Sequence, residues 1–529
     1  MKKRYIYSCL LIGATFIAGC TKNFDAINTN PTKVSATLFD PNFLMAQAQI
    51  KFSNTGYDQL LYQSMWSQSL ASTYDYYSNG DKYVASGSND NYKARTWTTS
   101  YGAVTLVDEM KNLVAGKADL SNLDNCGTIL RIMMLERITD AYGDIPFSQE
   151  GQAKAGITSP VFDTQESIYK SMLTQLAAAV PALSTSKAAP TSDLFYGGDI
   201  TKWKKLGYSL MLRVAMRLTK VDAATAKTYA EMAYTGGTMS AIADNAKVLA
   251  DDASGNSNSD ANALLVVADF REVRWSNTLI SYMKSTNDPR ISAIAEVSAG
   301  TGKAANEVLA AGNNTASLQF GMPNGYDLNG GATDISKAPN YPGTSPAASA
   351  TDSPAPDGKY SRPRFVVYDN KNRYNFILTY GETELLLAEA AVRGWSTGVA
   401  ATHYANALTA NMQTLSQFGS SSAVDAADIT TYVATHPLVA ATALQQINME
   451  YFVETSSTFN FNETWANWRR SGYPALTAVT YSGQFTSGTI PRRMPYPITL
   501  PSTNAANYAA AVARLSGGDT FSAKVWWDK

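Results

Sequence analysis

The chain has 529 residues and a formal net charge of −1, from 43 basic and 44 acidic side chains. Hydrophobic residues make up 45% of the sequence, which is enough for a large core and excludes a disordered chain. The charge balance lacks the basic excess that binding to phosphates requires, so we expect no nucleic-acid partner.

The first twenty residues have the features of an export signal. A basic cluster, Lys2-Lys3-Arg4, precedes a short apolar run over residues 5–18, and Gly19-Cys20 follows. The run is too short to span a bilayer permanently, and its end resembles the lipobox of bacterial lipoproteins. We expect a signal peptide over residues 1–19, cleavage before Cys20, and lipid on Cys20. The alternative is an unprocessed signal with an accidental cysteine.

Helical patterning dominates the rest of the chain. Residues 20–37 are polar and predict a lipidated tether, and from Phe39 apolar residues recur at threes and fours over 43–51 and 60–70. Paired helices joined by short turns resemble tetratricopeptide hairpins, although no clean repeat of about 34 residues is visible. Further helical runs are predicted over 103–113, 128–141, 166–183, 200–218, 380–393, 403–412 and 441–453.

Three long irregular stretches interrupt the helices, over residues 251–262, 299–317 and 329–362. Insertions of this length in a compact domain are usually functional. No linker separates autonomous domains. We therefore expect a single mainly α domain over residues 38–529, with long irregular loops and few short strands.

Cysteine and histidine are too scarce for a His/Cys metal site, and we expect no cofactor. Cys126 has no expected disulfide partner once Cys9 is removed and Cys20 carries lipid. We therefore expect it to be a small buried apolar side chain. The alternative to a metal-free chain is a structural calcium ion in the acidic loop over 251–260. That loop lacks the glycine and glutamate of an EF-hand, which favours a solvated loop.

Residues 140–150 read DAYGDIPFSQE. This string resembles the D-x-Y-G-D-[IV]-P-[YF]-[ST] signature of SusD/RagB-like proteins, the nutrient-binding lipoproteins of Gram-negative outer membranes. Other blocks that resemble the family follow in the expected order and extend the resemblance over almost the whole mature chain. They lie at 162–169, 198–203, 288–290, 323–325, 393–395, 463–470, 491–493 and 526–527.

The resemblance implies a SusD-like fold and a function. A lipid-anchored protein at the outer membrane, facing the cell exterior, would capture an oligosaccharide and deliver it to a SusC-like TonB-dependent β-barrel transporter, without catalysis and without catalytic residues. Two alternatives remain open. One is capture of an oligopeptide by the same kind of lipoprotein. The other is a secreted glycoside hydrolase, which needs two cooperating carboxylates in a cleft. No G-x-S-x-G, HExxH or P-loop motif supports an enzyme.

We expect the residues of the signature to stabilise the fold. Gly143 is expected to adopt a positive φ, and the flanking Asp140 and Asp144 are expected to cap backbone donors. The alternative for the two aspartates is a general acid/base pair. The tryptophans and arginines of 465–470 predict indole packing, with guanidinium groups bound to helix ends or carboxylates. Anion binding is the alternative for the arginines.

Aromatic side chains among acids and amides are the candidates for ligand contact. Flat rings stack on the C–H faces of sugars, and carboxylates bind their hydroxyls. In the resembling family, the loop after the first helical hairpin often contributes to glycan binding. The alternative is ordinary packing of these rings. The candidates are Tyr74, Asp75, Tyr76, Tyr77, Tyr83 and Trp97, followed by Trp275, Tyr326 and Tyr341 from later irregular segments.

Overall fold

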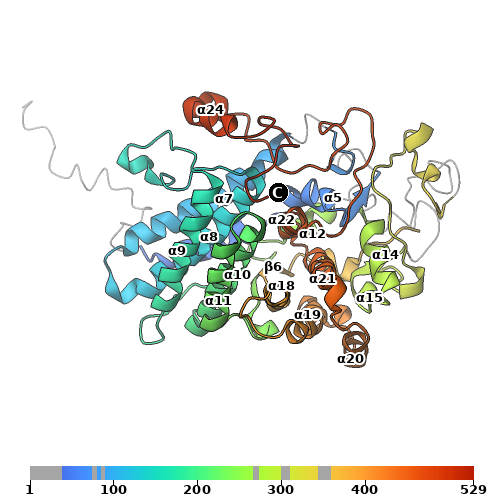
Figure 1. Cartoon of the computed structure of the whole chain (residues 1–529), viewed down its shortest axis with the longest axis horizontal. Coiled ribbons are helices and arrows are strands. Elements are labelled where there is room, and N and C mark those ends of the chain that lie inside the picture. Colours follow the sequence, from blue (N-terminus) through green and yellow to red (C-terminus); the bar gives the residue numbers. More distant parts are fainter. Residues whose placement is uncertain (1–38, 74–79, 85–89, 266–272, 299–309, 344–358) are drawn as a thin grey trace, which may run out of the picture. The chain divides into compact units, whose positions relative to one another are not determined.

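Consecutive helices pack against one another in the first half of the chain, as the computed structural model shows (Figure 1). Each helix of this group packs against the next, so the chain runs through a series of helical hairpins. The group comprises α7 (Asp90–Val114), α8 (Ser121–Tyr142), α9 (Gln165–Ala182), α10 (Ile200–Arg217) and α11 (Ala223–Gly236).

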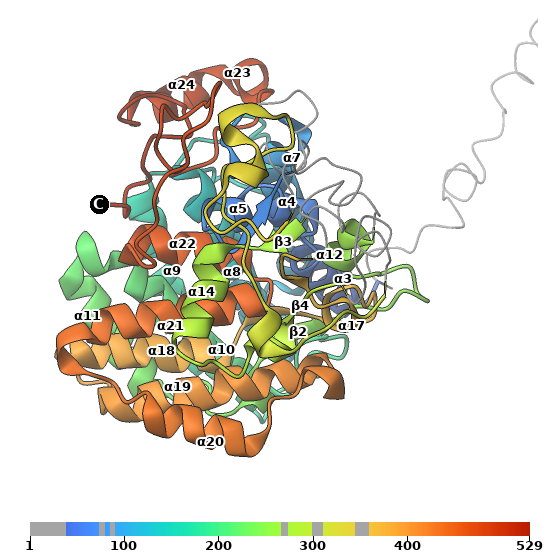
Figure 2. The ribbon, with the colours of Figure 1, turned by 90° about the vertical axis from the view of Figure 1, so that its right-hand side faces the viewer.

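A second helical group comes from the last third of the chain (Figure 2). Here α18 packs against α19 and α21, α19 also packs against α20, and α21 packs against α22. Helix α10 packs against α18 and so joins the two groups. The members are α18 (Tyr380–Val392), α19 (Ala400–Thr414), α20 (Ala426–Thr435), α21 (Ala443–Ser457) and α22 (Phe461–Ser471).

Local capping explains where these helices begin and end. The side chain of Asp199 accepts hydrogen bonds from the first-turn amides of α10, and Thr379 does the same for Glu382 N in α18. Just beyond α18, Gly394 has a φ of 79°. Only glycine adopts that backbone conformation readily, so the helix stops there.

Within the described residues, the strands form three short antiparallel pairs. β1 (Leu70–Ser72) pairs with β3 (Val273–Trp275), β2 (Ala246–Leu249) with β6 (Tyr374–Leu378), and β4 (Ala295–Glu296) with β5 (Arg362–Pro363). Each pair joins segments far apart in the sequence. Other α-helices are α3 (Asn42–Ser53), α4 (Tyr57–Leu60), α5 (Gln63–Trp66), α12 (Ser259–Leu264), α14 (Asn277–Ser285), α15 (Ile291–Ile294), α17 (Phe365–Tyr368), α23 (Leu500–Thr503) and α24 (Ala505–Ala513).

The structure describes residues 39–73, 80–84, 90–265, 273–298, 310–343 and 359–529. Contacts divide the chain into two units, residues 1–41 and residues 42–529, and the second forms one compact unit. The expected signal peptide, the lipidation site Cys20 and the tether to residue 37 lie outside the described residues. In the part of the chain that is described, no helix combines the length and the apolar character of a membrane span.

The mainly α fold with few short strands is confirmed, and each later helical run lies on an observed helix. The first part of the chain differs. Residues 60–70 do not continue as a helix: they form α4, α5 and then β1, where Leu70 pairs with Trp275. Helix α12 also occupies part of the irregular stretch 251–262. Cys126 is fully buried on α8, and burial raises the pKa of its thiol, as expected for an apolar filler.

Candidate functional site

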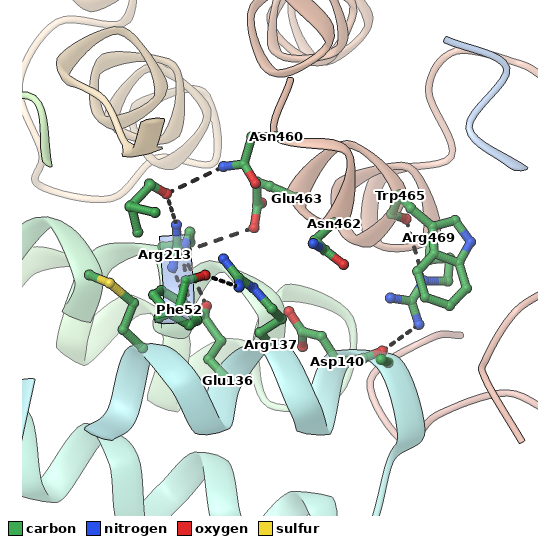
Figure 3. Close-up of a pocket in the computed structure, with 13 residues that line it drawn as sticks. Phe52, Glu136, Arg137, Asp140, Arg213, Asn460, Asn462, Glu463, Trp465 and Arg469 are labelled. Atoms are coloured by element: carbon green, nitrogen blue, oxygen red, sulfur yellow. Dashed lines mark hydrogen bonds and ion pairs between the residues drawn. The ribbon is translucent and has the colours of Figure 1, made fainter. Parts of the chain in front are cut away.

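Charged side chains from three helices meet in the interior beside the 140–150 motif (Figure 3). Arg213 Nη2 of α10 lies 2.6 Å from Glu136 Oε2 of α8. One turn further along α10, Arg217 Nη2 lies 2.5 Å from Glu463 Oε2 of α22, and its Nε lies 3.2 Å from Asp140 Oδ2. We call Glu136, Asp140, Arg213, Arg217 and Glu463 the interior ion network.

The cavity beside this network is too small for a nutrient. Its volume is about 30 Å³, and Phe52, Arg137 and Trp465 line it together with members of the network (Figure 3). A space of that size holds a water molecule or two and excludes a sugar ring. The network therefore lies inside the core and does not face a ligand.

Burial and ion pairing oppose each other in the network. Burial raises the pKa of Glu136, against the effect of Arg213. Burial also acts to raise the pKa of Glu463, but Arg217 and Arg213 outweigh it and lower that pKa. Because these charges depend on one another, the network ties α8, α10 and α22 together.

The signature glycine behaves as predicted, and its two aspartates differ. Gly143 has a φ of 86°, and Asp144 Oδ1 accepts a hydrogen bond from Gln165 N at 2.8 Å, which confirms a backbone cap. The capping prediction is wrong for the Asp140 carboxylate. It accepts hydrogen bonds from side chains, Arg217 among them, because it points into the interior between helices.

The tryptophan and arginine block on α22 packs as predicted. The Arg469 guanidinium lies 3.6 Å from the centre of the Trp465 ring and donates to the Asp140 carbonyl. Arg470 donates to both carboxylate oxygens of Glu389, at 2.6 and 2.7 Å. Both arginines are buried, and Arg470 also donates to the side-chain oxygens of Asn448 and Asn467, so packing is confirmed over anion binding.

A second, smaller hydrophobic cluster lies next to β1 and contains two of the predicted ligand contacts. Tyr326 and Tyr341 are partly buried and pack against the fully buried Tyr360. The ring centres of Tyr341 and Tyr360 are 6.3 Å apart, and Phe320 stacks on Tyr360 at 5.5 Å. We call Phe320, Tyr326 and Tyr341 the tyrosine patch.

The described residues on both sides of segment 74–79 adjoin this patch. Before the segment, Ala71 of β1 belongs to the same cluster. After it, Asp81 accepts hydrogen bonds from Gly325 N, at 2.6 Å, and from the Asn324 side chain. The chain therefore enters and leaves the predicted aromatic loop beside Tyr326. Tyr74, Asp75, Tyr76 and Tyr77 themselves lie outside the described residues.

Polar groups edge the patch. Asp327 Oδ2 accepts a hydrogen bond from the Tyr481 hydroxyl at 2.7 Å, and the Lys82 ammonium lies 5.5 Å from the centre of the Tyr481 ring. Burial works to raise the pKa of Asp327, but the hydrogen bonds from Tyr481 and neighbouring groups lower it below the usual value. Asp327 is only 2% exposed and also accepts from Thr333 Oγ1, so its carboxylate fixes the segment that carries Tyr326 and does not itself face a ligand.

Two other candidates lie in the core. Tyr83 and Trp275 are 0% exposed. Trp275 Nε1 donates to Ile294 O at 3.0 Å, and its ring packs edge-on against Tyr368. Their burial favours the packing alternative for both residues. We therefore leave them out of the candidate site.

Trp97 occupies a separate place on α7. Its ring lies 4.9 Å from that of Tyr101 and 5.2 Å from that of Tyr142, and it lines a pocket that also includes Leu500. Sequence reasoning did not find Tyr101, Leu500 or Tyr481. No local pattern marks them, because their partners are brought near only by the fold.

The acidic loop does not gather its carboxylates. Asp260 lies 3.1 Å from the guanidinium of the buried Arg373, and Asn258 caps α12 by accepting from Ala261 N. Asp251 and Asp252 are exposed. Within the described ranges, no group of three or more His, Cys, Asp or Glu side chains is arranged to hold a metal ion.

Comparison with known proteins places this helical architecture in a family. The model of the SusD-like family, described as starch-binding and associating with the outer membrane, matches residues 31–497. The chain therefore belongs to the SusD-like family, and the resemblance in the sequence is confirmed. No curated protein sequence matches significantly.

Solved structures of other proteins match the fold of this chain over nearly its full length. A chitin-binding protein matches with a TM-score of 0.78 and 28% identity, covering 93% of this chain and 100% of its own. A SusD-like protein described as Bacteroidetes AC2a matches with a TM-score of 0.77 and 24% identity, over 93% and 100%. A chitin-binding SusD homologue from Flavobacterium johnsoniae matches with a TM-score of 0.73 and 22% identity, over 92% and 98%. The last two likenesses concern the fold alone.

Proposed function

We propose that this protein captures an oligosaccharide at the cell surface and delivers it to a SusC-like TonB-dependent transporter in the outer membrane. One observation carries the proposal: the likeness to a chitin-binding protein covers the whole of that protein. Lipid on Cys20 and a tether over residues 20–37 would hold the helical body at the membrane while it binds and releases ligand.

The tyrosine patch is the proposed glycan site, together with Tyr74, Asp75, Tyr76 and Tyr77. Ring faces of Tyr326 and Tyr341 would stack on sugar rings. Asp327, which accepts hydrogen bonds from Tyr481 and Thr333, would keep the segment that carries Tyr326 in place. Asp81 would hold the end of the aromatic loop against the patch through its hydrogen bonds to residues 324 and 325.

Binding assays on the purified chain lacking residues 1–20 test the proposal. We expect binding to at least one member of a panel of soluble oligosaccharides, and at least about tenfold weaker binding of long oligosaccharides in the variant Y326A/Y341A. Binding only to oligopeptides would favour the alternative of peptide capture. If neither class binds, the proposal is wrong.

Two further measurements test delivery and the absence of catalysis. Co-purification of the lipidated protein with a TonB-dependent barrel from the outer membrane would support a transporter partner, and its absence from every barrel-containing fraction would contradict it. We expect no release of reducing ends from the bound oligosaccharide. Sustained release would favour the glycoside hydrolase alternative.

A further inference from the structure

A second pocket lies away from the residues of the tyrosine patch. It has a volume of about 470 Å³ and is formed by α7, by the second half of the 140–150 motif and the segment after it, and by α23. That volume is in the range of small-molecule sites, roughly 300–1,000 Å³. Its apolar walls come from Trp97, Tyr101, Pro146, Ile157, Pro160 and Leu500.

Contacts with neighbouring residues fix the two aromatic rings of the pocket, Trp97 and Tyr101. Trp97 packs edge-on against Tyr142 and Tyr496, with ring centres 5.2 and 6.0 Å away. The Tyr101 hydroxyl donates to Pro146 O at 2.7 Å, which fixes the second ring and satisfies its polar group. Because both rings are already positioned, a ligand stacking on them would not have to order them.

The polar lining includes Gln149 and Gln152, beside Thr158, Thr503 and Asn504. Gln149 accepts from Val161 N with its side-chain oxygen, and Gln152 donates its NH₂ to Ser148 O. Among the contacts of the described residues, this leaves the NH₂ of Gln149 and the side-chain oxygen of Gln152 for a ligand. Burial, reinforced by the nearby Asp108, raises the pKa of the lining residue Glu150, against the effect of Arg131, whose Nη2 lies 3.3 Å from Glu150 Oε2.

We propose that this pocket binds a 2-acetamido sugar unit as a second glycan site. An acetamido group combines a methyl group with one carbonyl acceptor and one N–H donor. Apolar walls suit the methyl group, Gln149 suits the carbonyl and Gln152 suits the N–H, while Trp97 and Tyr101 present faces for the sugar ring. The mostly apolar lining favours this group over a sugar that carries hydroxyls alone.

A pair of matched variants tests the site. Ala153 and Ala155 are both exposed and lie in the same short turn over Gln152–Ala155, but only Ala153 lines the pocket. In the Y326A/Y341A background, which removes the patch, we expect binding of an N-acetylglucosamine trimer to persist. There, A153W should weaken it at least about tenfold by filling the pocket, while A155W should change it less than about twofold.

Chemical specificity is tested with a cellotriose probe of the same length. Cellotriose should bind the Y326A/Y341A protein at least about tenfold more weakly than the acetylated trimer. Equal binding would overturn the acetamido assignment, and unchanged binding in A153W would overturn the site. If A153W abolishes trimer binding while Y326A/Y341A does not alter it, this inference stands and the patch proposal fails. Loss of all trimer binding in Y326A/Y341A overturns the inference and leaves the patch.

Discussion

The interior ion network and the tyrosine patch both contain side chains of the kinds that bind ligands. The network's side chains bind one another in the core, whereas those of the patch are partly exposed. In the network, Arg213 and Arg217 bind carboxylates of the same chain beside a cavity of about 30 Å³. In the patch, Tyr326 and Tyr341 are only partly buried, next to the ends of a predicted binding loop. The residues that resemble the family signature thus stabilise the fold. The better candidates for ligand contact lie in the loops.

Charge burial explains why the network is architectural. Two buried carboxylates around one guanidinium keep their charge only while that guanidinium is present. The patch carries no such interdependence, since its rings are uncharged and only partly buried against a second, smaller cluster. Changing them should therefore cost less stability than removing a charge from the network.

The largest expected effect is on stability in the network. Arg217→Met leaves Asp140 and Glu463 buried without their shared cation, and should lower the free energy of unfolding by about 3–5 kcal/mol. Urea denaturation measures this. The control is Lys154→Met, because Lys154 is 80% exposed and its partner Glu109 is 38% exposed, so this pair should contribute below ~1 kcal/mol. A loss in R217M no larger than in the control would remove the distinction between the two regions.

Acid should weaken the ion pair of Arg470 in the same helical group. Burial acts to raise the pKa of Glu389, but Arg470 and Arg393 outweigh it and lower the pKa from 4.5 to about 2. A lowered pKa stabilises the fold above the unfolded value, and that stability disappears as pH falls from about 4.5 to 2. The contribution is about 3 kcal/mol, at ~1.4 kcal/mol per unit.

The measurement compares urea denaturation of the wild type and Glu389→Gln across that pH range. The variant should already be weaker near neutral pH, since Arg470 loses its charged partner. Its stability should then decline less toward low pH than that of the wild type. Parallel curves for the two proteins would show that Glu389 does not carry this pH dependence.

In the patch, the expected effect is on binding. Y326A/Y341A should weaken binding of a long oligosaccharide at least about tenfold, or ~1.4 kcal/mol, because two stacking faces are removed. Calorimetry measures affinity, and thermal melting checks that the fold persists. Tyr234→Ala is the matched control, since Tyr234 is 39% exposed on α11. Equal affinity in both variants would place the glycan elsewhere.

The smallest expected effect distinguishes a core indole from a ligand contact. Trp275→Phe removes the hydrogen bond to Ile294 O and should cost roughly 1 kcal/mol of stability. Oligosaccharide affinity should remain unchanged, because the ring is 0% exposed. A tenfold loss of affinity with a normal melting curve would return Trp275 to the candidate site.

Much of the helical fold could be predicted from the sequence, because helix periodicity and capping are local. The predicted helical run over 200–218, observed as α10, and the stop at Gly394 depend on neighbours within a few residues. The site was predicted less completely. Tyr326 was identified as an aromatic residue in an irregular segment. Tyr481 was not identified, because its partner Asp327 is 154 residues away in the sequence.

The sequence by itself determined that this chain is mainly helical, that Gly143 takes a positive φ, and that the chain resembles the SusD-like family. Those features follow from the spacing of residues within short segments and from sequence blocks that occur in the order typical of the family. Only the tertiary structure decided that Trp275 is core while Trp97 lines a pocket, and that Asp140 binds side chains across helices. Burial and long-range pairing are properties of the assembled chain, so no local pattern encodes them.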